Sequence, residues 1–240
     1  MKIVIAPQSF KGSLTAKQAV RHISDAVHEI FPKSEIVELP IADGGDGTLQ
    51  TLVDATGGKI KKAKVLNPYG VNIESEWGLL GDNNKTAVIE MARSSGLALL
   101  NPKDLNPMIA SSYGTGQLIL EAVTNGCKKI ILGIGGSATN DCGVGAARSV
   151  GFKFLDTKNQ EVSNDVSTFN KIVNIDSSSV DTRIAGIDFE VACDVTNTLC
   201  GKEGASFIYA PQKGASQSQV QILDNSLQHV ASEIKKNLGV

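Results

Sequence analysis

One stretch of the chain, residues 130–145, constrains the fold more than any other. It reads IILGIGGSATNDCGVG, so that a short apolar run meets a cluster of glycines and small polar residues. The apolar run, residues 130–132, is typical of a parallel strand that is covered on both faces. The glycines that follow, Gly133, Gly135 and Gly136, allow positive φ and a close approach of the backbone to a ligand. We therefore expect a buried strand, a tight bend and then a helix.

The polar residues of the bend suit the start of that helix, which we expect near residue 143. Side-chain oxygens of Ser, Thr, Asn and Asp are good helix caps, and the bend supplies Ser137, Thr139, Asn140 and Asp141. The free N–H groups and the dipole at a helix N-terminus favour an anion, so we expect a phosphate or a carboxylate as the guest. A tight turn without a ligand is the alternative.

Composition narrows the classes of function. The chain has 240 residues, of which 41% are hydrophobic and 20% charged, and its net charge is −2. These values predict a globular protein of one large or two smaller domains, without the charge excess that attracts nucleic acid or a membrane surface. The four cysteines form no C-x-x-C pair, which argues against zinc and against a disulfide framework. We expect a cytoplasmic protein with small-molecule partners, because no signal peptide or bilayer-spanning run is recognisable; a homo-oligomer is left open.

The N-terminal segment alternates strands and helices. Residues 2–6 and 35–39 read as strands, and the helix between them starts at a capping box of Thr15 and Gln18. A second helix is expected over residues 48–55. This order favours parallel βαβ units, in which ligands collect at the carboxyl ends of the strands. Three side chains are expected there: Lys11, Asp43 and Asp46.

The pattern changes near residue 60, where we place a domain boundary. Residues 59–66, 72–80 and 85–91 read as strands joined by turn signals, and such short connections favour antiparallel pairing. We therefore expect an α/β protein of two domains, with residues 1–60 in a parallel α/β part and residues 61–240 in a mixed α/β domain that contains antiparallel strands and the glycine bend.

The C-terminal part holds two further candidate loops. A strand over residues 189–193 ends at Asp194, and Asn197 follows closely. The final helix starts at a second capping box, Ser216 and Gln219, and its long apolar stripe needs a surface to pack on. The polar, serine-rich residues 156–188 are expected to be mostly loop or short pieces.

Phosphoryl transfer accounts for these loops best. It needs lysines and backbone N–H groups to neutralise phosphate, and a carboxylate to hold Mg²⁺ or to take the acceptor's proton. Asp194, at a strand end, is the preferred base or metal ligand, while Lys11 and Lys213 can cancel the charge of a phosphate or carboxylate. Taken singly, each of these residues could equally be a cap or a solvated surface charge.

Of two other nucleotide-binding motifs, the P-loop is absent from the sequence and the dinucleotide fingerprint fits the glycine bend. No G-x-x-x-x-G-K-[ST] occurs, which excludes a standard P-loop. Residues 133–138 do fit the dinucleotide fingerprint G-x-G-x-x-A after a strand, and Asp156 lies at the distance of a ribose-binding acid. An NAD(P)-binding oxidoreductase is therefore an alternative.

Motifs along the whole chain resemble one known family. They are IAPQSFKGS (residues 5–13), ADGGDGT (42–48), VIEMA (88–92), YGTG (113–116), GIGGSATND (133–141), ACD (192–194) and PQKG (211–214). In this order and spacing they resemble the bacterial-type glycerate kinases, which phosphorylate D-glycerate with ATP.

The resemblance implies a fold and a site. The fold would be a flavodoxin-like domain with the second α/β domain inserted in it, and the product is typically 2-phosphoglycerate. ATP and Mg²⁺ would bind near the glycine bend, and glycerate near Lys11 and the Asp43 loop. The implied catalytic residues are Asp194, Lys11 and Asp43, and the implied metal ligands are Asp194 and Asp141. The implied binding residues are Ser9, Lys11, Gly44, Gly45, Asp46, Gly135, Gly136, Ser137, Thr139, Asn140, Asp141, Asn197 and Lys213.

The sequence departs from the family pattern at two points. The family loop usually reads Pro-Asp-Ser-Phe-Lys, whereas position 8 is Gln8, whose amide is neither a base nor a good Mg²⁺ ligand. Family members also continue well beyond residue 240. A second hypothesis is therefore a catalytically incomplete fragment that binds nucleotide and organic acid without turnover.

Overall fold

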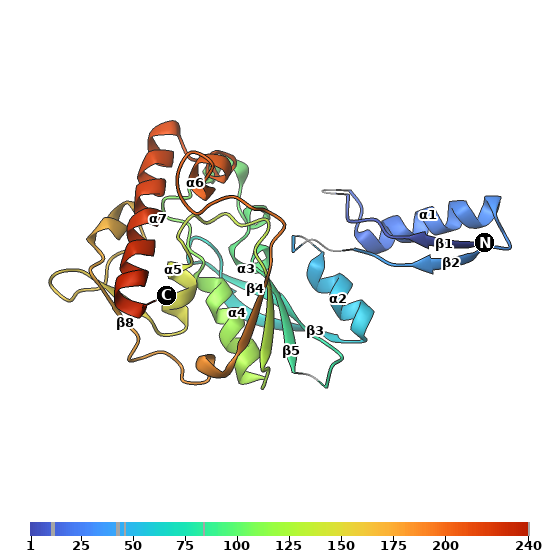
Figure 1. Cartoon of the computed structure of the whole chain (residues 1–240), viewed down its shortest axis with the longest axis horizontal. Helices are drawn as coiled ribbons and strands as arrows, with labels where there is room; N and C mark the ends of the chain where they lie inside the picture. Colours follow the sequence, from blue (N-terminus) through green and yellow to red (C-terminus); the bar gives the residue numbers. More distant parts are fainter. Residues whose placement is uncertain (11–12, 42–43, 46, 84, 240) are drawn as a thin grey trace.

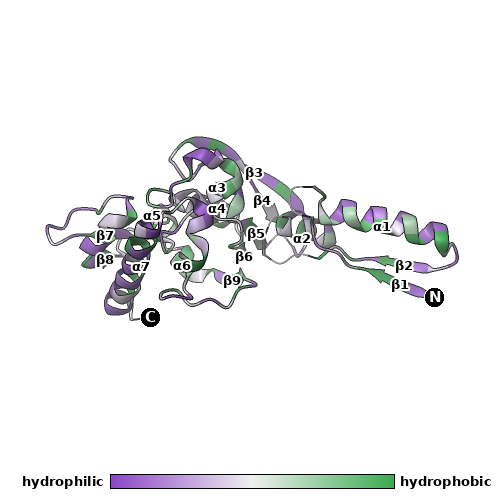
Figure 2. Cartoon of the chain, turned by 90° about the horizontal axis from the view of Figure 1, so that it is seen from above, coloured by the Kyte–Doolittle hydropathy of each residue, from purple (hydrophilic) through white to green (hydrophobic). Residues whose placement is uncertain are grey.

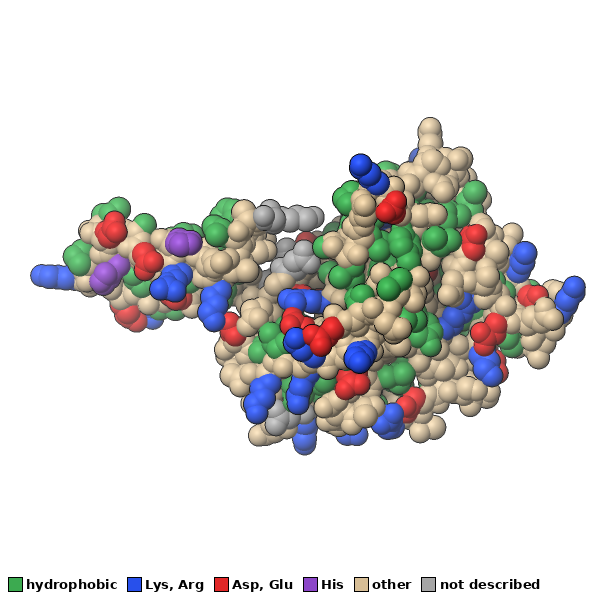
Figure 3. Space-filling view, turned by 180° about the vertical axis from the view of Figure 1, so that it is seen from behind, with side chains coloured by type: hydrophobic (Ala, Val, Ile, Leu, Met, Phe, Trp, Pro, Cys, Tyr) green, Lys and Arg blue, Asp and Glu red, His purple; other side chains and the backbone are tan. Residues whose placement is uncertain are grey.

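The computed structural model describes residues 1–10, 13–41, 44–45, 47–83 and 85–239. It consists of a main body around a five-stranded sheet and a slender N-terminal arm that projects from one side of that body (Figure 1). Basic and acidic side chains are intermixed on the face shown in Figure 3. None of the helices described is long and apolar enough to cross a membrane.

The N-terminal arm is one parallel strand–helix–strand unit. Strand β1 (Lys2–Ile5) pairs in parallel with β2 (Glu35–Glu38), and helix α1 (Ala16–Ile30) lies along the pair (Figures 1 and 2). The predicted capping box of α1 is present: Gln18 N donates to Thr15 Oγ1, and Thr15 N donates to Gln18 Oε1. The parallel arrangement expected for this segment is thus confirmed.

The central sheet is mixed, as expected. Its strand order is β3-β4-β5-β6-β9, in which β3, β4 and β5 pair antiparallel, whereas β5, β6 and β9 pair in parallel. The strands are β3 (Lys59–Leu66), β4 (Asn72–Leu79), β5 (Thr86–Glu90), β6 (Lys129–Gly133) and β9 (Asp188–Ala192). The carboxyl ends of β5, β6 and β9 therefore lie side by side at one edge of the sheet.

Helices cover both faces of this sheet. Helix α2 (Thr48–Thr56) packs Leu49 and Val53 against Val88 of β5. Helix α4 (Tyr113–Thr124) packs on the opposite face, where Leu118 joins the cluster of Ile89, the next residue of β5. Residues 86–90 are all buried, as an apolar strand covered on both faces should be. The domain boundary at residue 60 stays a prediction, and α2, which precedes it, packs on the sheet that follows it.

A second core lies beyond the sheet and supports the last helix. Helix α7 (Gln217–Leu238) has the predicted capping box and buries Val220, Leu223 and Val230 against the cluster that contains Phe169 and Ile172. These partners come from residues 156–188, which hold short elements, as expected. The other elements are α3 (Ala92–Ser95), α5 (Val144–Ser149), β7 (Lys153–Leu155), β8 (Asn174–Asp176), α6 (Ala205–Tyr209) and the 3₁₀ helices at Leu97–Leu99, Pro102–Asp104, Val166–Lys171, Ile184–Gly186 and Pro211–Lys213.

Candidate functional site

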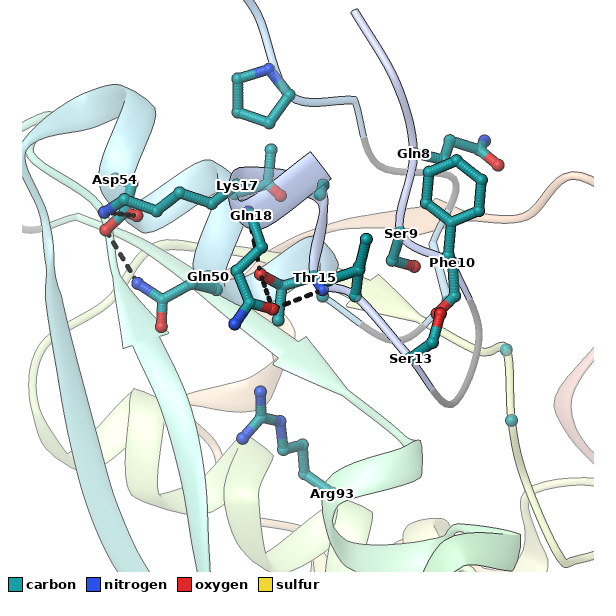
Figure 4. Close-up of a pocket in the computed structure, with 18 of the residues that line it drawn as sticks. Gln8, Ser9, Phe10, Ser13, Thr15, Lys17, Gln18, Gln50, Asp54 and Arg93 are labelled. Atoms are coloured by element: carbon teal, nitrogen blue, oxygen red, sulfur yellow. Dashed lines mark hydrogen bonds and ion pairs between the residues drawn. The ribbon is translucent and has the colours of Figure 1, made fainter. Parts of the chain in front are cut away.

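A cleft of about 770 Å³ lies where the loop after β1 faces the carboxyl ends of the central strands. One wall comes from the N-terminal arm and helix α2, and the other comes from Arg93, the glycine bend and the loop after β9 (Figure 4). The residues that line the cleft include Gln8, Ser9, Gly45, Arg93, Gly135, Gly136 and Asp194. The cleft thus occupies the position where ligands collect in parallel sheets.

Two glycine loops meet at the base of this cleft, backbone against backbone. A Cβ on Gly44 would lie 2.4 Å from the carbonyl oxygen of Ala192, and a Cβ on Gly133 would lie 2.5 Å from that of Gly44. Gly135 N donates to Gly44 O at 3.3 Å. Gly133 and Gly135 were expected to make room for a ligand, whereas both make room for the other loop. Gly135 and Gly136 still line the cleft, and of the three only Gly136 has positive φ, at 70°.

Asp194 lies in the cleft because it follows the carboxyl end of strand β9. Strand β9 is parallel to β6, with Ala192 opposite Gly133, so the residues after β9 lie beside the glycine bend. Asp194 is exposed and lines the cleft, and it makes no hydrogen bond or ion pair with any residue the structure describes. The second acid of the lining, Asp54, is occupied by Lys17 and Gln50. The fold therefore brings Asp194, Gly135 and Gly136 together.

The rest of the bend turns away from the cleft into what we call the bend cluster: Ser137, Thr139, Asp141 and Lys213. Lys213 Nζ donates to Ser137 Oγ at 3.0 Å and to Thr139 O at 2.6 Å. Lys213 is only 8% exposed, and this burial lowers its pKa to about 8, while the nearby charge of Asp141 acts in the opposite direction. The ammonium group thus holds the bend and does not line the cleft.

The carboxylate of Asp141 accepts four hydrogen bonds from groups of its own chain. Its Oδ2 accepts from Ser112 N and Ser112 Oγ, both at 2.8 Å, and from Gly145 N at 3.1 Å, while Oδ1 accepts from Gly143 N at 3.2 Å. The N-cap of α5 is Gly143, which has no side-chain cap hydrogen bond, and among the four predicted capping residues Asp141 is the one that accepts from an N–H of this helix, that of Gly145. Because Asp141 is 3% exposed and does not line the cleft, we do not retain it as a ligand of Mg²⁺. Within the described ranges, no three His, Cys, Asp or Glu side chains are grouped to hold a metal.

Two predicted binding residues hold loops together outside the cleft. Asn140 Nδ2 donates to Ser206 Oγ at 3.0 Å, which links the bend to α6. Asn197 Nδ2 donates to Glu203 O at 2.9 Å, and its Oδ1 accepts from Tyr209 Oη. Neither residue lines the cleft.

The predicted N-terminal site residues divide into two groups. Ser9 and Gly45 line the cleft, and Gly44 supports it from the base. Lys11, Asp43 and Asp46 lie outside the described residues. Gln8, where the sequence departs from the family pattern, lines the cleft as well.

Sequence reasoning missed the charged group at the end of β5. Glu90 is 2% exposed; its Oε1 accepts from Leu49 N at 2.8 Å and its Oε2 from Arg93 Nε at 2.9 Å. Arg93 Nη1 donates to Glu76 Oε2 at 2.6 Å. The available signal was a glutamate that ends the apolar strand TAVIE and precedes an arginine by three positions, because a buried carboxylate requires partners.

The bend does not have the geometry of a dinucleotide fingerprint. In that motif the helix opens at the glycines, whereas α5 begins at Val144, six residues after Ala138. Asp156 Oδ1 accepts from Lys158 N and Gln160 N in a turn after β7, which pairs with β8 in a separate sheet. The alternative of an NAD(P)-binding oxidoreductase is therefore wrong in its structural premise.

Comparisons with known proteins agree on one family. The sequence model of the glycerate kinase family matches residues 3–240. A glycerate kinase of Haemophilus influenzae is 47% identical over 239 residues, and the glycerate 2-kinase of Escherichia coli K12 is 46% identical over 240 residues; each alignment covers 100% of this chain. A crystal structure of a protein assigned as glycerate kinase 2, from Salmonella typhimurium LT2, superposes with a TM-score of 0.90 at 42% identity, again over 100% of this chain.

The same comparisons define how much of the relatives this chain represents. It spans 63% of the length of the Haemophilus and Escherichia proteins and 64% of the Salmonella chain. The match over residues 3–240, together with the shared α/β architecture, shows that the chain belongs to the glycerate kinase family.

Proposed function

We propose that this chain carries the catalytic cleft of a glycerate kinase, which transfers the γ-phosphoryl group of ATP to a hydroxyl group of D-glycerate and forms 2-phosphoglycerate. The observation that carries the proposal is Asp194, a carboxylate without a described partner, which lines the cleft together with the glycine backbone at 135 and 136. Family membership and relatives named glycerate kinase support the same reaction.

Asp194 is assigned as the group that takes the acceptor's proton. Transfer of a phosphoryl group to an alcohol requires that the hydroxyl lose its proton as the new P–O bond forms. Asp194 is an exposed carboxylate with no competing donor among the described residues and can accept that proton. Asp141 is buried, and its carboxylate is already engaged in four hydrogen bonds that hold the bend.

The glycine bend is assigned to the phosphate groups of ATP. Gly135 and Gly136 line the cleft, and Gly136, with a φ of 70°, allows the backbone to turn there and to approach phosphate oxygens closely. Ser9 and Gly45 line the facing wall. Lys11, Asp43 and Asp46, which lie outside the described residues, remain proposed contributors. Lys213 supports this bend from behind through Ser137 and Thr139.

The described residues fit a magnesium ion that is held mainly by the nucleotide. Mg²⁺ usually binds one or two protein carboxylates together with substrate phosphates and water. Of the two acids described in the cleft lining, Asp54 is bonded to Lys17 and Gln50, so Asp194 is the carboxylate that can bind the ion. When bound, the ion would neutralise charge on the phosphates.

The test is release of ADP by the purified chain, measured in a coupled assay with ATP and Mg²⁺, with and without D-glycerate. We expect D-glycerate to stimulate ADP release. Binding of ATP and D-glycerate by titration calorimetry without turnover would show instead that the chain is the catalytically incomplete binding fragment. A folded chain that binds neither ligand would contradict both assignments.

A further inference from the structure

Arg93 is the described cationic group whose role the proposed reaction has not yet used. It follows β5 in the short helix α3 and lines the cleft opposite the N-terminal arm. Its side chain is 34% exposed, and Figure 4 shows the guanidinium pointing into the space beneath Thr15, Gln18 and Gln50. The lysine of the facing wall, Lys17, is paired with Asp54 at 2.9 Å.

The guanidinium is held by two carboxylates, which leave the Nη2 nitrogen open. Nε donates to Glu90 and Nη1 donates to Glu76, whereas Nη2 has no hydrogen-bond partner among the residues described. Glu90 is itself held by Leu49 N at the start of α2, so the guanidinium has a defined orientation before any ligand arrives. A guanidinium that is fixed in this way can donate from Nη2 to an anion in a charge-assisted hydrogen bond.

The charge of this group selects between the anions that the cleft could receive. Arg93 with Glu76 and Glu90 carries one net negative charge. The N-terminus of α2 partly offsets the charge of Glu90, and the side chain of Glu76, 33% exposed, is screened by water. Repulsion by the two glutamates grows with the charge of the ligand, so it disfavours a triphosphate more than a singly charged carboxylate, which can accept from Nη2.

We propose that Arg93 binds the carboxylate of the acceptor acid and thereby makes the cleft selective for short hydroxy acids over uncharged polyols. This inference rests on the proposed function for the identity of the acceptor. Glu90 and Glu76 act as positioning residues, because they orient the guanidinium and do not themselves contact the substrate.

The test compares D-glycerate with glycerol, in which a CH₂OH group replaces the carboxylate. The wild-type chain, Arg93→Gln and Arg183→Gln are assayed with both acceptors, for turnover and for direct binding by calorimetry. Arg183 is a matched control, because it is an exposed arginine paired with Asp181 that does not line the cleft. We expect Arg93→Gln to reduce the preference for D-glycerate about 10- to 100-fold, to leave the KM for ATP within about threefold, and Arg183→Gln to change neither.

The outcomes separate this inference from the proposed reaction. A wild-type chain that binds D-glycerate in preference to glycerol but does not release ADP, with the preference lost in Arg93→Gln, supports the inference and contradicts the reaction. A wild-type chain that turns over, with the preference unchanged in Arg93→Gln, overturns the inference alone. Binding of neither acceptor by the wild-type chain overturns both.

A second variant covers the case in which Arg93→Gln does not fold. Glu76→Gln removes a competing carboxylate but keeps the guanidinium and its pair with Glu90. We expect this variant to bind D-glycerate more tightly, by about two- to fivefold, and glycerol as before. Equal or weaker binding of D-glycerate would overturn the inference, because a structural role of Arg93 predicts no gain that is specific to the acid.

Discussion

The cleft wall and the bend cluster are neighbours in sequence but opposite in environment. Gly135 and Gly136 line the cleft, and Asp194 joins them as an exposed carboxylate without a described partner. One residue further along the bend, Ser137 accepts from the buried Lys213, and Asp141, 3% exposed, accepts four hydrogen bonds. Both regions contain the residue types that phosphoryl transfer requires.

The difference shows that polar residues with a structural role have hydrogen-bond partners within the chain, whereas a residue available to a ligand does not. A buried charge persists only where its own chain supplies hydrogen bonds, and those bonds leave nothing for a substrate. An exposed charge without partners contributes little to stability and remains able to react. Substitutions in the cleft wall should therefore change activity, whereas substitutions in the bend cluster should change stability.

The largest effect is expected for Asp194→Asn. Loss of the proton acceptor should lower kcat about 10²- to 10⁴-fold, while the melting temperature and the affinity for ATP change little, because Asp194 has no described partner to lose. The measurements are ADP release and thermal denaturation. Asp188→Asn is the control, since it removes an exposed carboxylate at the opposite end of the same strand. Activity that survives Asp194→Asn within a few-fold would refute the role of Asp194.

Asp141→Asn should have the converse effect. The amide keeps the shape of the side chain but offers fewer acceptor sites to the donors at Ser112, Gly143 and Gly145, so we expect a loss of about 2–4 kcal/mol in the free energy of unfolding. Urea denaturation measures this loss. Asp156→Asn is the control, because its hydrogen bonds lie in an exposed turn and should be worth under about 1 kcal/mol. Equal free energies of unfolding for Asp141→Asn and Asp156→Asn would contradict the structural role of Asp141.

Lys213 should make the free energy of unfolding depend on pH. Its pKa is about 8 in the folded chain and near the ordinary lysine value of 10.5 when unfolded, so between these values the unfolded chain binds the extra proton. Stability therefore rises as pH increases through this window, by about 2 kcal/mol between roughly pH 7 and roughly pH 9.5. Urea denaturation at the two pH values tests this. The rise should disappear in Lys213→Met and persist in Lys202→Met, which removes an exposed lysine; a rise that persists in Lys213→Met would assign it to another group.

The smallest effect is expected for Gln8→Asp. This substitution restores the family's usual carboxylate to the cleft, but Asp194 already supplies one, so we expect kcat to change by less than about threefold. The assay is glycerate-dependent ADP release, with Gln50→Glu as a second substitution of a cleft amide by an acid. An increase beyond about tenfold in Gln8→Asp alone would show that position 8 limits the reaction.

Local sequence patterns predicted most of the secondary structure. Both capping boxes formed where Thr15–Gln18 and Ser216–Gln219 indicated. The antiparallel strands after residue 58 and the parallel strand before the bend were also predicted correctly. These features depend on side chains within a few positions of one another, so a linear reading contains the necessary information.

The candidate site was only partly predictable. The carboxyl end of β9 delivered Asp194 to the cleft, as parallel-sheet geometry implies. Arg93 was missed because its role depends on Glu76 and Glu90, which only the pairing of β4 and β5 brings together. Residues 156–188 were predicted to be mostly loop or short pieces, and their polar, serine-rich sequence did not indicate that Phe169 and Ile172 pack against α7.

The sequence by itself determined the order of strands and helices, the family, and the set of residues from which a site could be built. The tertiary structure decided which of those residues face the cleft. Lys213 meets Ser137, Ser112 meets Asp141 and Gly44 meets Gly133 across long separations in the chain. Such contacts are set by how whole elements pack, and packing consumes the hydrogen-bonding capacity of some polar groups while it leaves others open to a ligand.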